Sequence, residues 1–420
     1  MTEGWRSSYF RRYGLWLILV VAAVAYYPRF SHSPLELYPK SASCLRHGEA
    51  LQICDPGFTY PPIFAFVMLP FDAMPAWLRN PVWYLVTLGA AIGSFRLSEM
   101  PAGSAIAKPL TAAELGWVRL LALVLSLKFV LAVLENQAYD LLVLLFVLLG
   151  LAALVTGREF WAGAGLAFAA ALKATPLVFV PYLLWKRHFA AAAAFAVVFI
   201  AASYLPDLFF TAAGASHGYF NTWLREVAGA SLNVEVAKHA FWAGANLLNH
   251  SLHGAVSLNI DETAQPGLYR AVLYAVDGAF ILVVGTLLVL SPRGRASIAI
   301  DGSLLVISML MLSPMTSRSH YVVLLLPYMT LVTLWFRDDR TRNLGSAVLA
   351  ASFVLATLTS NDAVGEAVTV WAYGHSFLVL GTLVLLIYFA VLVIRRRREQ
   401  VASAPADRLG TIRPVGDARQ

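Results

Sequence analysis

Long apolar runs separated by short basic breaks dominate the pattern of hydrophobic and polar positions along this chain of 420 residues. Residues 271–290 and 371–394 form two such runs. Each run carries the roughly 20 apolar residues that a helix needs to cross about 30 Å of hydrocarbon. Backbone polar groups in lipid must be paired within their own element, and a continuous helix achieves this. The pattern therefore predicts an all-α polytopic membrane protein.

The run lengths predict a bundle of about 12 membrane-spanning helices in a single domain over residues 1–398. Segments 29–60 and 207–266 are long enough to hold structure outside the bilayer. Within the second segment, residues 220–227 repeat apolar side chains at helical spacing, which is typical of an interfacial helix or of a helix packed on the bundle. The polar tail 399–420 is expected to be disordered. The expected spans are 14–28, 61–78, 80–98, 115–134, 139–156, 160–186, 188–206, 268–291, 297–314, 319–336, 343–360 and 371–394.

The composition and the distribution of charge support this prediction and indicate an orientation. The chain is 59% hydrophobic and 13% charged, with a mean hydropathy of +0.68, which excludes a soluble domain. The net charge of +7 comes from arginines and lysines that gather in alternate connections. That arrangement is the positive-inside pattern and does not indicate nucleic acid binding. We therefore expect a bacterial inner-membrane protein with both termini in the cytoplasm and segments 29–60 and 207–266 outside.

The first apolar run lacks a small-residue cleavage site, so it is expected to remain as a helix. Two cysteines, Cys44 and Cys54, both fall in the first outer segment. The outer side of a bacterial inner membrane is oxidising, so a disulfide between them is expected. Closing so short a loop stabilises a fold by about 2–3 kcal/mol.

The first outer segment also carries candidate chemistry. Glu36, Glu49 and Asp55 are its carboxylates, and one of them could act as a general base, although an exposed loop acid is usually only solvated. Tyr38 lies among them. Tyr60 precedes two prolines where the next helix starts, a position that proline favours.

Three further polar positions interrupt or border the apolar runs. Gln137 and Asp140 lie between two spans, in a group that is either a plain turn or part of a site. Strict alternation of the spans puts Gln137 on the cytoplasmic side, unless one of the short spans between residues 61 and 98 fails to cross, so its side stays open. Lys128 lies inside a span, where a lysine is a functional candidate or extends its ammonium to the interface. Lys173 precedes Pro176 in mid-run, which indicates either an anion-binding cavity or a kinked helix.

Two polar groups follow in the C-terminal half. Asn249, His250 and Ser251 belong to the second outer segment and are compatible with a sugar site or with an ordinary polar loop. Arg318 and His320 lie between the ninth and tenth spans, on the outer side by the charge pattern. Arginine binds phosphate through its planar fork, so this pair suits a lipid phosphate, or else anchors the loop to lipid headgroups.

Taken in order, these motifs resemble glycosyltransferase family 87, the polyprenol-phosphate-dependent mannosyltransferases within the C-type, multi-span glycosyltransferases. The resemblance implies a C-type bundle with two structured outer loops. The matching motifs run from about residue 34 to residue 330 and comprise Tyr38 and Gly48, Phe58 to Pro62, Asn136 and Gln137, Lys173 and Pro176, Asn249 to Gly254, and Ser313, Pro314, His320 and Tyr321.

The resemblance implies an inverting transfer of a hexose, with mannose as the expected sugar, from a polyprenyl-phosphate donor. The acceptor would be an envelope glycolipid or glycan on the outer face of the inner membrane. In the family an aspartate of the first outer loop acts as the base, four residues before the tyrosine, but this chain has Pro34 there. Glu36 is the nearest substitute, followed by Asp55 and then Glu49.

The resemblance also implies roles for the remaining residues. The phosphate of the donor would be bound by Lys173, Arg318 and His320. The substrates would also contact Tyr38, Tyr60, Gln137, Asn249, His250 and Ser251.

No cofactor is predicted, because a sugar carried on a lipid phosphate needs no nucleotide-binding fold and the chain has no Gly-rich phosphate loop. No compact cluster of carboxylates indicates a metal site, and dependence on a divalent cation stays open. Two other functions also stay open. Lys128 and the break after Lys173 would suit a transporter or flippase of a lipid or small anion, and Pro34 would suit an inactive scaffold of an envelope-polysaccharide complex. The long outer segments and the lack of repeated halves favour the transferase.

Overall fold

The computed structural model describes residues 34–55, 57–211, 217–229 and 246–402, together with four isolated positions of the first apolar run. The rest of the expected span 14–28 and residues 403–420 of the predicted tail lie outside this part. Every regular element in the described ranges is a helix, as the apolar pattern predicts. The last helix continues through Arg398 to Ala402, so the first residues of the predicted tail are helical.

The helices fall into four groups along the chain. The first outer segment and the start of the bundle contain η2 (Pro34–Glu36), α2 (Leu37–Arg46), α3 (Leu51–Cys54), α4 (Pro62–Val67) and α5 (Leu69–Ala73). The next group contains α6 (Ala76–Ser104), α7 (Ala112–Glu135), α8 (Asp140–Thr156), α9 (Glu159–Leu172), η3 (Thr175–Val178), α10 (Phe179–Lys186) and α11 (Phe189–Phe209).

The second outer segment contains α12 (Gly218–Trp223), a π-helical turn η4 (Leu224–Ala228) and α15 (Leu252–Asn259). The C-terminal group contains α16 (Pro266–Leu290), η5 (Arg295–Ser297), α17 (Ile298–Met311), η6 (Arg318–Leu324), α18 (Leu325–Trp335), α19 (Arg342–Ser352), η7 (Phe353–Thr357), α20 (Asn361–Val364), α21 (Glu366–Gly374) and α22 (Phe377–Ala402).

Four of the described helices, α7, α11, α16 and α22, are long and apolar enough to cross a membrane. Burial separates the helices into an inner and an outer set. Every residue of α17 is buried, and α18 is buried over almost all of its length, whereas α11 and α16 leave most of their apolar side chains exposed. A helix that is apolar all round either fills a core or faces lipid. We therefore assign α17 and α18 to the centre of the bundle and α11 and α16 to its lipid-facing surface.

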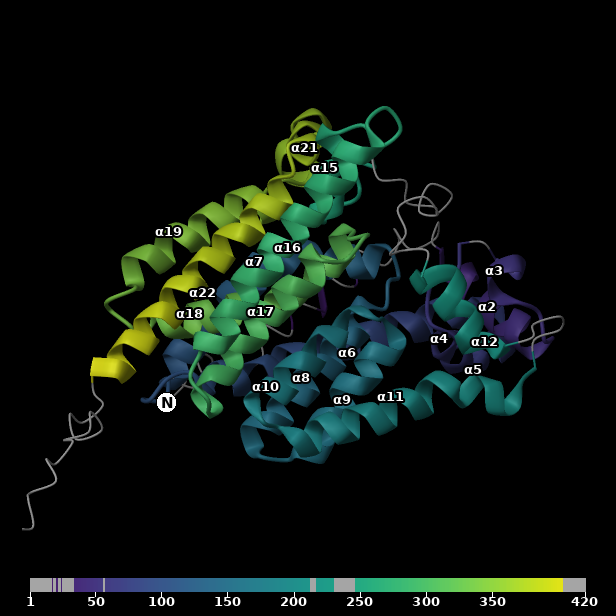
Figure 1. The fold of residues 1–420 in the computed structure, drawn as a ribbon, viewed down its shortest axis with the longest axis horizontal. Helices are drawn as coiled ribbons and strands as arrows, with labels where there is room; N and C mark the ends of the chain where they lie inside the picture. Colours follow the sequence, from purple (N-terminus) through teal and green to yellow (C-terminus); the bar gives the residue numbers. More distant parts are fainter. Residues whose placement is uncertain are drawn as a thin grey trace, which may run out of the picture.

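Basic connections gather at one end of the bundle, where α10, α16 and α22 end and α17 begins. Arg396 donates hydrogen bonds to the carbonyls of Ala105 and Ala296, at 2.9 and 3.1 Å. Lys186 lies 3.0 Å from Asp301, and both side chains are almost fully buried. Figure 1 shows this end of α22 far from α2, α3 and α12, which lie together at the opposite end of the molecule. The two ends therefore differ in charge, as the positive-inside pattern requires.

The prediction of one span over residues 160–186 is wrong. Helix α9 ends at Leu172, the chain turns at Lys173, and η3 and α10 lead back toward the starting end. A contact of 2.7 Å between Glu159 and His188 joins the two ends of this hairpin. The sequence feature behind the turn is Pro176, since proline lacks a backbone N–H and the residue before it disfavours the helical conformation.

Small residues let this hairpin pack deeply against its neighbours. A Cβ atom added to Gly163 of α9 would lie 2.0 Å from the carbonyl oxygen of Ala191 on α11. Close approach of backbones through glycine and alanine is a common way to pack helices in membranes, where lipid offers no hydrophobic driving force. At 14 residues, α9 spans only about 21 Å, so Lys173 lies within the depth of the bundle.

The expected span 61–78 is also not a single crossing. The apolar stretch Pro62–Ala73 is divided into α4 and α5, and both helices pack against α2. The two helices have six and five residues and together cover about 17 Å, too little for a bilayer. Without this crossing the alternation of the following helices shifts, and Gln137 falls at the same end as the outer segments. The sequence left the side of Gln137 open, and the structure places it at this end of the bundle.

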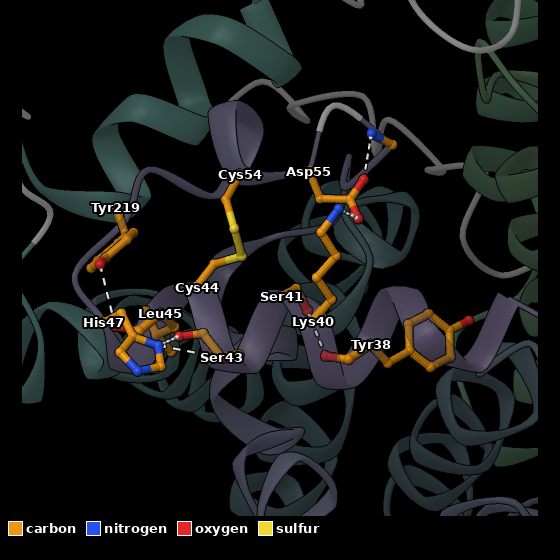
Figure 2. Close-up of a disulfide and its surroundings, with 11 residues drawn as sticks. Tyr38, Lys40, Ser41, Ser43, Cys44, Leu45, His47, Cys54, Asp55 and Tyr219 are labelled. Atoms are coloured by element: carbon orange, nitrogen blue, oxygen red, sulfur yellow. Dashed lines mark hydrogen bonds and ion pairs between the residues drawn. A yellow bond between two sulfur atoms is a disulfide. The ribbon is translucent and has the colours of Figure 1, made fainter. Parts of the chain in front are cut away.

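The first outer segment is a small helical unit held by several links (Figure 2). Cys44 of α2 and Cys54 of α3 form a disulfide. Lys40 forms an ion pair with Asp55 at 3.2 Å, and the hydroxyl of Tyr219 donates to the carbonyl of Leu45 at 3.4 Å. Residues 220–227 form a helical stretch packed on the bundle, because Phe220 and Trp223 are buried. The sequence allowed either an interfacial helix or a helix packed on the bundle, and the structure shows a packed helix.

Replacing Cys44 and Cys54 together by Ser should lower the thermal midpoint of the purified protein. A disulfide that closes a loop of this size adds about 2–3 kcal/mol to the free energy of unfolding, and the variant loses that contribution. Wild-type protein under reducing conditions is the matched control and should melt like the variant. Mass spectrometry of the non-reduced protein should find the two cysteines linked within one chain. Two free thiols in protein taken from native membranes would contradict the disulfide.

Candidate functional site

A buried cluster of three polar side chains lies at the end of the bundle away from the basic connections. Lys173 Nζ lies 2.6 Å from Asp140 Oδ1, and His320 Nε2 lies 3.7 Å from the same oxygen. Asp140 is 4% exposed. The three residues come from the start of α8, the turn after α9 and the 3₁₀ helix η6, so the folded hairpin is what brings them together.

The local sequence explains why each side chain points into the cluster. Helix α7 ends at Glu135, and two residues later Gln137 has φ +47°, a left-handed conformation that reverses the chain so that Asp140 begins α8. Gln137 is held there because its carbonyl accepts a hydrogen bond of 2.8 Å from Trp83 Nε1. Non-glycine residues adopt positive φ only when the surrounding structure enforces it. Gln137 therefore sets the direction of the chain at the site.

The hydrogen bonds of His320 define its protonation. Ser317 N–H donates to His320 Nδ1 at 3.2 Å, as part of the capping box that starts η6. Because Nδ1 accepts this bond, the neutral ring carries its proton on Nε2, the nitrogen that faces Asp140. His320 thus presents an N–H, and not a lone pair, to the cluster.

The cluster lines a small pocket whose other walls come from the centre of the bundle. Thr175 and Ser313 add hydroxyl groups, and the apolar wall is formed by Val143, Met309, Leu310 and Val323. The pocket has a volume of about 10 Å³, room for a single water molecule, and its polar groups converge on that space.

Aromatic side chains of the first outer segment cover this region. The rings of Tyr38, Tyr60 and Tyr139 lie 4.9 to 6.3 Å apart, centre to centre. Lys173 Nζ lies 5.8 Å from the centre of the Tyr139 ring. Burial, together with the nearby negative charge of Asp140, raises the pKa of Tyr60 to about 12. The hydroxyl of Tyr60 therefore stays protonated beside the carboxylate of Asp140.

A second polar cluster, formed by Lys128, His250, Arg318 and Tyr373, lies on the other side of η6. Lys128 Nζ donates to the carbonyls of Ala356 and Thr359 at 2.7 and 2.6 Å and lies 5.6 Å from the centre of the Tyr373 ring. The ring of His250 lies 4.5 Å from that of Tyr373. The charge of Arg318 acts on both Lys128 and Tyr373.

The two clusters differ in their balance of charge. Asp140 offsets Lys173 and His320, whereas neither Lys128 nor Arg318 forms an ion pair within the described residues. Burial and the positive charges of Lys128, Arg318 and His320 lower the pKa of His250 to about 3, so this imidazole is neutral. Its buried Nε2 has no hydrogen-bond partner among the described residues. The second cluster thus concentrates positive charge without an acid.

Asn249 and Ser251 fix the backbone segment that leads into η6, the helix that contributes to both clusters. Asn249 Nδ2 donates to the carbonyl of Pro314 at 3.0 Å, and Asn249 Oδ1 accepts from the N–H of Thr316 at 3.1 Å. The hydroxyl of Ser251 donates to the same Oδ1 and caps α15 by accepting from Gly254 N–H. These bonds fix the residues before η6, so Asn249 and Ser251 serve as a brace for Arg318 and His320.

The carboxylates expected in the first outer segment lie elsewhere. Glu36 is exposed at the start of α2. Asp55 accepts from Gly57 N–H and pairs with Lys40, so both of its oxygens are engaged within its own segment. From the sequence, Asp140 belongs to a group that is either a plain turn or part of a site, without a role of its own. The signal that could have found it is its position at the start of a span, where an acid is rare, together with the lysine at the break of a later span.

Comparisons with known proteins identify a family and a relative that this chain resembles. A family model described as glycosyltransferase family 87 matches residues 58–314. The chain is similar to a polyprenol-phosphate-mannose-dependent alpha-(1-2)-phosphatidylinositol pentamannoside mannosyltransferase of Mycobacterium tuberculosis (strain CDC 1551 / Oshkosh), with 28% identity over 304 residues. The similarity covers 72% of this chain and 63% of the relative. No solved structure matches the chain.

Replacing Asn249 by Ala should destabilise the protein, because the carbonyl of Pro314 and the N–H of Thr316 lose their partner, at about 1 kcal/mol for each hydrogen bond. Asn249→Asp keeps the acceptor oxygen and should lose less. The exposed Asn259, whose Nδ2 donates to Ala255 in α15, offers the control variant Asn259→Ala. The midpoint of thermal unfolding in detergent measures the effect. Equal midpoints for Asn249→Ala and the control would contradict the bracing role.

Proposed function

The chain belongs to glycosyltransferase family 87, and on this premise we propose that it is a membrane mannosyltransferase that takes mannose from a polyprenyl phosphate. The name of the mycobacterial relative states dependence on polyprenol phosphate mannose and transfer to a phosphatidylinositol mannoside. The chain spans 63% of that relative, so donor and acceptor are proposals for this protein. The acceptor we propose is an envelope glycolipid or glycan.

We further propose a C-type glycosyltransferase fold in the inner membrane, with the basic end of the bundle in the cytoplasm and both termini on that side. Support comes from the arginines that meet at the ends of α10, α16 and α22, since cytoplasmic connections carry such an excess. The two polar clusters then lie near the outer face. A donor and an acceptor that are both lipids could reach them from the bilayer.

The observation that carries this function is the positive charge of the second cluster. Lys128 and Arg318 are half-buried, and holding two such cations close together without a counter-ion is unfavourable. An anionic substrate removes that cost. Arg318 can bind phosphate through two parallel N–H groups, and Lys128 adds a second charge beside it. The charges of Lys128 and Arg318 also act on His250, whose buried Nε2 has no hydrogen-bond partner among the described residues. We assign the phosphate of the polyprenyl donor to this cluster.

Lys173 and His320 then act at the sugar end of the donor. Both lie beside Asp140, whose negative charge reduces the net positive charge around them. They therefore attract a phosphate less strongly than Arg318 and Lys128 do. Fixed N–H groups at this point stabilise the negative charge that develops on the leaving phosphate oxygen, and they need no reorganisation during the reaction. The aromatic rings of Tyr38 and Tyr60 offer faces against which a sugar ring can pack.

Replacing Arg318 by Ala should raise the donor KM by roughly 10- to 150-fold, because the variant loses a charge-assisted hydrogen bond that contributes about 1.5–3 kcal/mol to binding. Arg318→Lys keeps the charge but loses the fork and should fall between Ala and wild type. The assay titrates radiolabelled polyprenyl phosphate mannose against mannose transfer in membranes. Arg225→Ala, at an exposed arginine of η4, is the control. An unchanged donor KM in Arg318→Ala and in Lys128→Met would place the phosphate elsewhere, with Lys173 the next candidate.

The proposed orientation predicts where reporters are found. A reporter fused in the tail after Ala402 should read cytoplasmic, and one inserted at Ala264, in the exposed turn before α16, should read external. A pair of fusions, to a phosphatase that is active only outside and to a fluorescent protein that folds only inside, measures both positions. A cytoplasmic signal at Ala264 would overturn the placement of both clusters at the outer face.

A further inference from the structure

The pocket beside η6 contains one group able to accept a proton. We propose that Asp140 is the catalytic base of this protein and takes the place of a carboxylate in the first outer segment. The inference rests on the proposed transfer of a sugar to an acceptor hydroxyl. It also explains how the chain could catalyse the transfer although Pro34 occupies the position where the family carries its aspartate.

The other titratable groups of the pocket cannot accept the proton. Lys173 is an ammonium bound to a carboxylate at 2.6 Å, so it has no free lone pair. His320 uses Nδ1 to accept from Ser317 N–H, and its Nε2 carries the proton. Ser313 donates its hydroxyl to the carbonyl of Met315 at 2.7 Å, and a neutral hydroxyl is a weak base. Asp140 remains.

The carboxylates of the first outer segment do not reach this pocket in the structure. Glu36 is exposed, and Asp55 is engaged by Lys40 and Gly57. Tyr38, two residues after Glu36, does reach the region: it is buried, and the charge of Asp140 acts on it and on Tyr60. Asp140 therefore lies where the first outer segment covers the pocket, on the side that a loop carboxylate would have approached.

The geometry around Asp140 leaves one of its oxygens for the reaction. Lys173 and His320 both approach Oδ1, and neither the ammonium nor the imidazole binds Oδ2. The charge of Lys173 and the N–H groups of both residues keep the carboxylate ionised between turnovers, as opposite charges and hydrogen bonds favour the charged form. Oδ2 is then the acceptor atom that a substrate hydroxyl can approach.

The step balances with the groups present. The acceptor hydroxyl oxygen attacks the anomeric carbon and forms the new glycosidic bond, while its proton passes to Asp140 Oδ2. The bond between the anomeric carbon and the phosphate oxygen breaks, and its electron pair leaves with the polyprenyl phosphate. The anomeric configuration inverts, and the proton later returns from Asp140 to solvent.

A purely positioning role for Asp140, as counter-ion of Lys173 and His320, makes different predictions. Loss of positioning would weaken donor binding and raise the donor KM. Loss of the base should lower kcat by about 10²- to 10⁴-fold and leave the donor KM close to that of wild type. An anionic nucleophile that needs no deprotonation distinguishes the two roles further, because it can react without a base but still needs the bound donor.

The experiment uses the full-length protein in membranes with labelled polyprenyl phosphate mannose and a glycolipid acceptor. Asp140→Asn should show the loss in kcat, and Asp140→Ala with added azide should form mannosyl azide of inverted configuration. Glu36→Gln and Asp55→Asn are the matched controls and should keep most of their turnover. Retained binding of the labelled donor shows that a variant is folded.

Several results would overturn the inference. Asp140→Asn that transfers mannose at the wild-type rate would exclude the base, and so would a folded Asp140→Ala that azide does not rescue. Near-complete loss of transfer in folded Glu36→Gln would also overturn it, whether or not the Asp140 variants fold. Wild-type protein that transfers no mannose from this donor would instead refute the proposed function, so the two failures are distinguishable.

Discussion

The ion pair between Lys173 and Asp140, 2.6 Å long and buried, is the contact on which the organisation of this protein depends. A lone charge at this depth would cost several kcal/mol, so the lysine at the hairpin turn and the acid at the start of α8 stabilise each other only when both elements are in place. The pair joins α8 to the turn after α9, and His320 adds η6 to the same oxygen. Three segments distant in sequence meet at one carboxylate.

The second cluster differs because its cations have no such partner in the described part of the chain. Lys128 is held by carbonyls at the end of η7, and Arg318 follows a segment braced by Asn249. Carbonyl oxygens solvate an ammonium but do not cancel its charge. The site thus combines one neutralised cluster with one positively charged cluster on opposite sides of η6. This asymmetry suits a substrate that has a reacting sugar at one end and a phosphate at the other.

The opposite end of the bundle uses charge for a different purpose. Arg396 and Arg337 donate to backbone carbonyls of other connections, and Lys186 and Asp301 form a buried pair between α10 and α17. These contacts close the connections against one another and maintain the orientation of the helices. Their arginines satisfy carbonyls at helix ends, which would otherwise lack partners. The charges at this end are paired or bound to carbonyls within the protein, whereas Arg318 and Lys128 at the opposite end have no acidic partner among the described residues.

The sequence by itself determined the helical class, the basic end and the segments that carry chemistry, because length, hydropathy and charge act locally on each apolar run. It also identified Lys173, Arg318 and His320 as unusual cations. Only the tertiary structure decided that residues 160–186 fold back as a hairpin, that residues 62–73 do not cross, and that Gln137 lies with the outer segments. Each of these depends on packing between distant helices, such as Gly163 against Ala191. The importance of Asp140 emerged for the same reason, since an acid at the start of a helix is ordinary until the fold places a lysine and a histidine beside it.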